Sequence, residues 1–355
     1  MPTAIAKLPD TRFPILQAPM AGASGADLAV AVSAAGGLGS LPCAMLRPDQ
    51  VRGLVASIRA RASGPLNLNF FCHVPPVPDA KREYEWKHRL TPYYQELGLE
   101  PAAEPSAPVR APFDDAMCAV VEELKPEVVS FHFGLPPEPL LARVKSTGAA
   151  VLSSATTVAE AVWLEQHGCD AVIAQGVEAG GHRGMFLATD VSTQAGTMAL
   201  LPQIVNAVKV PVIAAGGIMD ARGIAAAFAL GASAVQLGTA YLRCKECATS
   251  GVHRRALETV RDAETVLTNI FTGRPARGIV NRLIRELGPM RDDVPAFPQG
   301  AHALAPLRAA AEARGSGDFS PLWAGQGAAL ARDVDAAVLT RELGEEALAL
   351  VPRSG

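Results

Sequence analysis

Short apolar segments alternate along the chain with longer amphipathic or alanine-rich segments. Runs such as Ala171–Ala174 and Val212–Ala215 are continuously apolar, whereas Pro48–Ala62 and Val158–His167 mix apolar and polar residues over helical lengths. Strands that are apolar on both faces and separated by helices are typical of a parallel sheet that is covered on both sides. The pattern therefore predicts an α/β fold built around a parallel sheet.

The number of predicted strands decides which α/β fold is expected. Eight strand–helix units match a closed (β/α)8 TIM barrel. An open doubly wound sheet is the alternative, but no GxGxxG motif follows the first strand, and the glycine-rich turns follow late strands. The predicted strands are Phe13–Ala18, Leu38–Leu41, Leu66–Phe71, Val128–Phe131, Ala150–Ser153, Ala171–Ala174, Val212–Ala215 and Ala234–Leu237.

Two segments interrupt the regular alternation of strands and helices. Residues 73–112 follow the third strand and are rich in proline, charge and aromatic side chains, and residues 268–335 follow the eighth unit. Insertions of this length are usually functional lids or extra subdomains. We expect a single domain over residues 1–355, in which 73–112 is an inserted lid and 268–335 is a C-terminal cap over the barrel mouth.

Composition and charge narrow the class of protein. The 355 residues are 49% hydrophobic and 19% charged, which allows a sizeable buried core, and the net charge of −3 without a long basic run argues against nucleic-acid binding. The N-terminus has no apolar h-region, and the uncharged stretches Leu28–Leu46 and Gly223–Leu242 contain glycines that favour a helix, a turn and a strand over a membrane span. We expect a cytoplasmic protein that does not contact a membrane, and a homo-oligomer is left open.

The six cysteines do not form a metal-binding pattern. Only Cys244 and Cys247 have CxxC spacing, and a second pair at metal-ligand spacing is missing. We therefore interpret the cysteines as mostly buried thiols and expect no metal.

Glycines end the two last predicted strands. Gly216 and Gly217 follow the seventh strand, shortly before a helix for which Asp220 is the expected cap, and Gly238 and Thr239 follow the eighth. TIM barrels commonly bind phosphate at these two loops, because glycine lets backbone N–H groups approach the anion. Tight turns without a ligand are the alternative, but two such turns at these two places favour a phosphate site.

A third glycine-rich segment, AQGVEAGGHRG, follows the sixth strand. Gln175 ends that strand, and Gly180 and Gly181 make the loop pliable enough to lie against a flat cofactor or a phosphate. An exposed flexible loop with incidental polar residues is the alternative. Its position directly after a barrel strand favours a cofactor contact.

These segments belong to an ordered series of motifs that spans nearly the whole chain. The series resembles that of the nitronate monooxygenase family, once called 2-nitropropane dioxygenases. Its central motifs are shared with the FMN-dependent enoyl-acyl carrier protein reductases, so SFHFG is the discriminating element. The motifs are QAPMAG (Gln17–Gly22), SFHFG (Ser130–Gly134), AQGVEAGGHRG (Ala174–Gly184), PVIAAGGI (Pro211–Ile218), QLGTAYL (Gln236–Leu242), FTGRPARG (Phe271–Gly278) and PLWAGQ (Pro321–Gln326).

The resemblance implies an FMN enzyme that oxidises alkyl nitronates with O2 to a carbonyl compound and nitrite, without a metal. Trp323 and Gln326 are implied to approach the isoalloxazine ring. The other residues implied to contact FMN are Pro19, Met20, Asn69, Gln175, Gly180, Gly181, Gly217, Gln236, Leu237, Gly238 and Thr239.

Two histidines are candidate catalytic residues. His132 stands at the end of the fourth predicted strand, where barrel enzymes place catalytic groups, and would orient the nitronate or take the α-proton of a neutral nitroalkane. A core histidine is the alternative interpretation of His132. His182 would contact the flavin or polarise the nitro group, with a helix-start or phosphate contact as its alternative. His73 has no comparable context, and Arg274 and Arg277 are expected to make structural hydrogen bonds.

Two other functions stay open at this point. An FMN- and NAD(P)H-dependent reductase of enoyl thioesters or quinones is compatible with the shared motifs, because such reductases need no separate nicotinamide motif. A flavin-binding module without catalysis would require both candidate histidines to be idle. Comparing NADH oxidation with O2 uptake on nitronate separates these functions.

Overall fold

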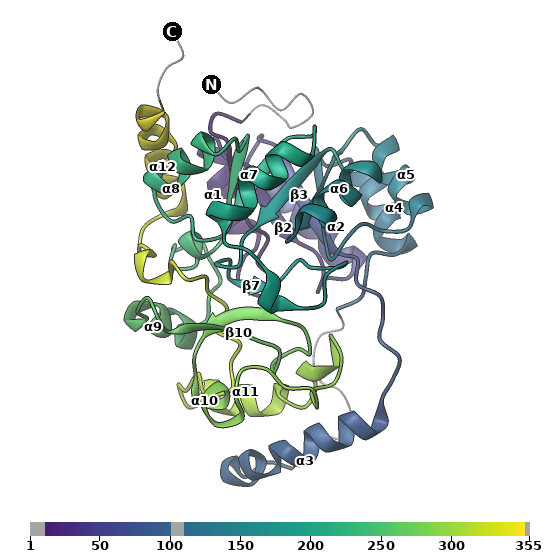
Figure 1. Cartoon of the computed structure of the whole chain (residues 1–355), viewed down its shortest axis with the longest axis vertical. Helices are drawn as coiled ribbons and strands as arrows, with labels where there is room; N and C mark the ends of the chain where they lie inside the picture. Colours follow the sequence, from purple (N-terminus) through teal and green to yellow (C-terminus); the bar gives the residue numbers. More distant parts are fainter. Residues whose placement is uncertain (1–10, 101–109, 352–355) are drawn as a thin grey trace.

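A computed structural model describes residues 11–100 and 110–351 of the chain (Figure 1). Eight parallel strands form one sheet in the order β1-β9-β8-β6-β5-β4-β3-β2, and a bridge between Leu16 and Leu38 joins the two edges into a barrel. The predicted TIM barrel and its eight strand positions are confirmed. The strands are β1 (Ile15–Gln17), β2 (Gly39–Pro42), β3 (Leu66–Phe71), β4 (Val128–His132), β5 (Ala150–Ala155), β6 (Ala171–Gln175), β8 (Val212–Ala215) and β9 (Ala234–Leu237).

Helices surround the barrel, and α12 packs against α8 and α1 (Figure 1). The expected cap is present, because Asp220 accepts hydrogen bonds from the backbone N–H groups of Arg222 and Gly223. Asp114 caps α4 in the same way and accepts from the backbone N–H of Met117. The barrel helices are α1 (Ala26–Ala34), α2 (Pro48–Arg59), α4 (Asp115–Leu124), α5 (Glu138–Ser146), α6 (Val158–Gln166), α7 (Thr197–Ala207), α8 (Ala221–Ala229) and α12 (Ala336–Leu350).

The inside of the barrel is packed with side chains. Leu152, Ile173 and Ile213 belong to a buried apolar cluster contributed by strands around the ring. Two larger clusters fill the space between strands and helices. Because the interior is filled, a ligand has room only at an end of the barrel.

A second, antiparallel sheet was not predicted. It consists of β10 (Thr265–Thr268), β11 (Ala276–Ile279) and β7 (Gly181–His182), in the order β10-β11-β7. The strand β7 lies in the glycine-rich loop after β6, and its His182 pairs with Ala276 of the FTGRPARG segment. Two residues are too few to show an alternating pattern, which explains why the sequence does not predict this strand.

The predicted lid contains an 18-residue helix, α3 (Ala80–Leu97), that was not predicted from the sequence. Trp86, Leu90 and Tyr94 are buried, and the Tyr94 hydroxyl donates to the Ala303 carbonyl at 2.6 Å. Figure 1 shows α3 beside α10 and α11, away from the barrel helices. The remaining helices are α9 (Gly251–Thr259), α10 (Arg282–Leu287) and α11 (Ala305–Ala313), with short 3-10 turns at Val191–Thr193, Thr239–Tyr241, Gln299–Ala301 and Ala328–Leu330.

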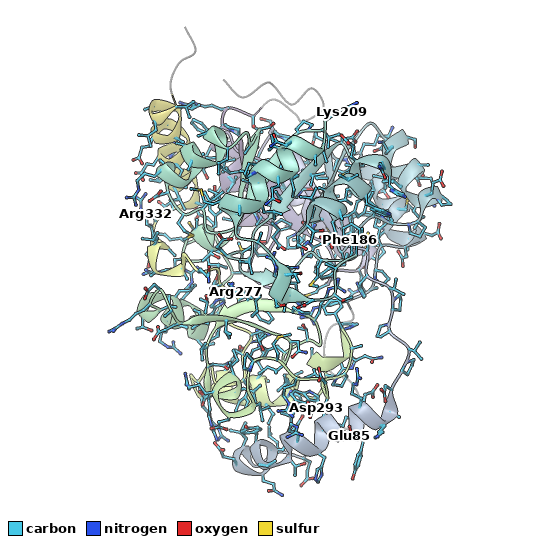
Figure 2. The ribbon with its side chains drawn as sticks, in the orientation of Figure 1. Glu85, Phe186, Lys209, Arg277, Asp293 and Arg332 are labelled. Carbon is cyan, nitrogen blue, oxygen red and sulfur yellow. The ribbon has the colours of Figure 1, made fainter. Side chains whose placement is uncertain are left out.

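Residues of the 73–112 and 268–335 segments therefore share one apolar cluster. An ion pair between Arg89 and Asp293, 2.7 Å apart, joins the same two segments at the surface. Figure 2 shows Asp293 and Glu85 at this end of the molecule, Lys209 at the opposite end, and Arg277 between them.

All six cysteines are free thiols, and Cys244 and Cys247 are buried, as expected. Within residues 11–100 and 110–351, no cluster of histidine, cysteine and acidic side chains has the geometry to hold a metal ion. Over the same residues, no helix combines the length and the apolar character needed to cross a membrane.

Candidate active site

A cavity of about 250 Å³ lies at the carboxyl ends of the barrel strands. It is lined by the loops after β1, β6, β8 and β9, by the ends of β3 and β4, and by residues 320–325. Leu237 does not line it, because that side chain is buried in the apolar core, and neither does the exposed Gln326. The other predicted site residues line the cavity: Pro19, Met20, Asn69, His132, Gln175, Gly180, Gly181, His182, Gly217, Gln236, Gly238, Thr239 and Trp323.

The turns after β8 and β9 leave backbone donors free at the cavity. Gly217 has a φ of 72°, in the left-handed region that favours glycine, and Gly238 has an ordinary φ of −111°. Among the described residues, neither N–H group donates a hydrogen bond to a protein acceptor. Unpaired backbone N–H groups on two neighbouring turns fit a phosphate group.

Close backbone contacts leave no room for a side chain at Gly180. A Cβ atom at this position would lie 2.5 Å from the backbone nitrogen of Gly325 and 2.6 Å from the carbonyl carbon of Ala324. The backbone of Gln326 also donates to the carbonyl of Glu178 at 2.9 Å. The segment after Trp323 therefore packs directly on the loop after β6 and forms one wall of the cavity.

Amide side chains provide hydrogen-bonding groups deeper in the cavity. The Oε1 atom of Gln236 is buried and has no partner among the described residues. Asn69 donates from Nδ2 to Ser130, which leaves its Oδ1 as an acceptor. A buried acceptor without a donor is costly, so a ligand with N–H groups on a flat ring fits this wall.

One ring nitrogen of His182 is hydrogen-bonded and the other is not. Nε2 of His182 lies 2.9 Å from the Thr272 hydroxyl, whose other contact is the carbonyl of Arg274 at 3.4 Å. Nδ1 of His182 has no hydrogen-bond partner among the described residues, and it carries the lone pair in the tautomer in which Nε2 donates to Thr272. Burial holds the pKa of His182 well below its ordinary value, so the ring is neutral at pH 7.

Both ring nitrogens of His132 are already engaged. Its Nε2 donates to the His182 carbonyl at 3.2 Å, since a carbonyl only accepts, and its Nδ1 accepts from the Ser154 hydroxyl at 3.1 Å. Burial lowers the pKa of His132 to about 4. His132 therefore contacts the backbone of His182, and the open imidazole nitrogen at the cavity belongs to His182.

Further contacts hold the loop that carries His182. Gln175 donates from Nε2 to the His182 carbonyl at 3.1 Å and accepts from the Gly184 N–H at 2.7 Å. Arg183 is fully buried and donates to the carbonyls of Gln175 and Gly176 and to the Gln194 side chain. Each of the three guanidinium nitrogens donates one of these bonds and the side chain is fully buried, so Arg183 supports the loop.

A group of aromatic and charged residues beside the two histidines was not predicted from the sequence. His73 is buried with its ring 4.8 Å from that of Phe297. The Arg274 guanidinium lies 3.9 Å from the centre of the Phe133 ring and donates to the Met185 carbonyl. His73 and Phe297 come from the two inserted segments, whose folding back onto the barrel has no signal in the local sequence.

Acid is expected to destabilise the fold between about pH 6.5 and pH 4. Burial lowers the pKa of His73, His132 and His253 to about 4, whereas an unfolded histidine titrates near 6.5. Between these values the unfolded chain binds protons that the folded chain does not, so the free energy of unfolding falls as pH falls and is constant above this window.

Thermal or urea midpoints measured from pH 7.5 to pH 4.5 test this prediction. For each buried histidine that stays neutral, the free energy of unfolding should fall by about 1.4 kcal/mol for every pH unit within the window. His253→Asn should show a shallower decline than the wild type, and a midpoint that is flat down to pH 5 in the wild type would contradict the prediction.

The fold and the cavity are those of a (β/α)8-barrel enzyme whose site lies at the carboxyl ends of the strands. The family model described as nitronate monooxygenase matches residues 3–346. The nitronate monooxygenase of Pseudomonas aeruginosa is 44% identical over 341 residues, which cover 94% of this chain and 95% of that protein. The chain therefore belongs to the nitronate monooxygenase family, a family of flavin-dependent oxidoreductases.

Two solved structures are similar to this chain over nearly its whole length. The crystal structure of a nitroalkane oxidase from Streptomyces ansochromogenes is similar with a TM-score of 0.88 and 41% identity, covering 96% of this chain and 97% of that one. FabK from Thermotoga maritima is similar with a TM-score of 0.72 and 28% identity, covering 96% and 94%.

Proposed function

We propose that the protein oxidises alkyl nitronates with O2 to a carbonyl compound and nitrite, and that its flavin is FMN. The observation that carries this proposal is the open Nδ1 of the neutral His182 on the wall of a cavity that also carries two glycine turns suited to one phosphate. The full-length likeness to a nitronate monooxygenase supports the same reaction.

The residues of the cavity fit FMN. Gly217, Gly238 and Thr239 would hold its phosphate through backbone donors, and Gln236 and Asn69 would meet the polar edge of its ring. Met20 and Trp323 provide apolar walls. A bound flavin supplies the electron transfer between nitronate and O2.

The protein's own groups position the substrate and handle its proton. Nδ1 of His182 accepts the α-proton when a neutral nitroalkane enters, while Thr272 holds the opposite ring nitrogen. His132 and Gln175 fix the carbonyl of His182 and thereby the direction of its ring. A nitronate that is already anionic needs no base and uses the same contacts for orientation.

We also propose that residues 73–112 and 268–335 cover the barrel mouth as lid and cap. Their shared apolar cluster and the position of Trp323 on the cavity wall support this role. The six free thiols suit a reducing compartment, which supports the cytoplasmic location as a proposal.

One set of measurements on the purified protein tests the function. We expect O2 uptake and nitrite release with pre-formed alkyl nitronate, no dependence on NADH, and FMN rather than FAD in the supernatant after heat release. Rapid NADH oxidation with a quinone or an enoyl thioester, and none of the nitronate reaction, would instead establish the reductase. A flavin-loaded protein that is inactive in both assays would establish a binding module.

A further inference from the structure

Arg110 is a cationic side chain on the wall of the cavity, and it lies outside every motif of the sequence. It stands where the chain returns from the lid to the barrel, and it is partly buried. Burial lowers the pKa of its guanidinium, and the charge of Arg308 lowers it further. Among the described residues, no carboxylate pairs with it and no acceptor receives a hydrogen bond from it.

The other arginines around the cavity have partners. Arg308 donates to Glu312 at 2.8 Å, and Arg274 donates to the Met185 carbonyl and lies over the Phe133 ring. Glu312 is the one carboxylate among the described lining residues, and Ser320 and Arg308 already occupy it. Within residues 11–100 and 110–351, the charge of Arg110 therefore has no compensating carboxylate at the cavity wall, and an anionic ligand would compensate it.

Arg110 lies close to the proposed reaction centre. After burial, its charge is the largest influence that lowers the pKa of His182, ahead of His132 and Arg274. Because Arg110 and His182 line the same cavity, a substrate that contacts Nδ1 of His182 shares that cavity with this positive charge.

We propose that Arg110 is a specificity-determining residue that binds the two oxygen atoms of the nitronate group. The inference rests on the proposed function. A planar guanidinium matches two oxygens on one atom, as it does in a carboxylate. With a neutral nitroalkane, the α-proton moves to Nδ1 of His182, the C–H electron pair forms the C=N bond, and the negative charge that develops on the oxygens is stabilised by Arg110.

Steady-state kinetics on the flavin-loaded Arg110→Met variant tests this role. We expect KM for pre-formed nitronate to rise about 10- to 100-fold, which is the loss of a hydrogen-bonded charge pair, while kcat changes less than about threefold. For a neutral nitroalkane, kcat should fall as well. Arg110→Lys keeps the positive charge but loses the planar guanidinium, so its KM for nitronate should lie between those of the wild type and Arg110→Met. Arg89→Met is the matched control. It removes a lid cation that pairs with Asp293, and its kinetic constants should resemble those of the wild type.

A binding measurement separates this inference from the proposed function. Nitrate is a planar oxyanion, and its titration into the flavin-loaded protein, followed by flavin absorbance, needs no turnover. If the wild type does not oxidise nitronate but Arg110→Met still weakens nitrate binding about tenfold or more, the function fails and the oxyanion site stands. Unchanged nitrate affinity and unchanged KM in Arg110→Met, or equal effects in Arg89→Met, would overturn the inference.

Discussion

Replacing His182 by glutamine is expected to lower kcat for a neutral nitroalkane by about 10²- to 10⁴-fold, which is the usual contribution of a positioned imidazole to proton transfer. Its Nδ1 is the open imidazole nitrogen at the cavity, and glutamine can still reach Thr272 but offers no comparable base. The loss with pre-formed nitronate should be much smaller. Both constants are measured per bound flavin, so that cofactor loss does not imitate a catalytic defect.

His132→Asn is the matched comparison. His132 donates to the carbonyl of His182 and does not present a free ring nitrogen, so its replacement should disturb neutral and anionic substrates to a similar, smaller extent while flavin stays bound. A selective loss on the neutral substrate in His132→Asn, with none in His182→Gln, would exchange the roles of the two histidines. Unchanged kinetics in both variants would remove both from the reaction.

The pH dependence gives a further check on the base. Because burial depresses the pKa of His182 well below 6.5, its neutral form persists into acid. The value of kcat/KM for the neutral nitroalkane should therefore stay level as pH falls through 6.5 and should decline only at lower pH, where Nδ1 becomes protonated. A decline centred near pH 6.5 would show that the base is an ordinary exposed imidazole.

The barrel could be predicted from sequence because each of its strands and helices is marked by residues within that element. Each barrel strand is a short apolar run bounded by turn residues. The helices between the strands carry their own caps, such as Asp220 at the start of α8. The glycine turns after β8 and β9 follow strand ends that converge in a barrel, so their meeting at one cavity could also be inferred.

The parts that could not be predicted depend on contacts between distant segments. Gly181–His182 becomes a strand only because β11 pairs with it about a hundred residues later in the chain. Arg110 lines the cavity at the end of the inserted segment whose helix α3 packs against α11, and His73 packs against Phe297 of the second inserted segment. Helical spacing in α3, with Trp86, Leu90 and Tyr94 on one face, is a usable signal that the neighbouring prolines obscure.

The chemistry of individual side chains also required the structure. Arg183 and His182 are neighbours in a glycine-rich loop, and residue type alone favours both as ligand contacts. The structure shows that Arg183 is fully buried and bonded to three acceptors, while His182 has a free nitrogen at the cavity. Hydrogen-bond partners, which no sequence pattern encodes, separate the supporting residue from the candidate base.

Substituting valine for Gly238 is expected to abolish flavin retention while the barrel stays folded. The sequence points equally to Gly217 and Gly238, but the structure separates them. Gly217 has a positive φ, so any side chain there strains the backbone as well as the ligand. Gly238 has a φ of −111°, and a Cβ atom there would lie 3.3 Å from the Cβ of Ala18 and 3.6 Å from the Sδ of Met20, a tight but tolerable fit.

The Gly238→Val side chain therefore lies at the cavity wall without backbone strain, in the space where the proposed phosphate meets its backbone donors. Hydrogen bonds to a charged group contribute about 1.5–3 kcal/mol each, so losing two of them weakens FMN binding roughly 10²- to 10⁴-fold. Flavin content after gel filtration, with circular dichroism as the measure of folding, tests this. Gly53→Val on α2, where an added Cβ meets nothing within 4 Å, is the matched control and should keep its flavin. Full flavin occupancy in a folded Gly238→Val protein would show that the phosphate does not bind at the turn after β9.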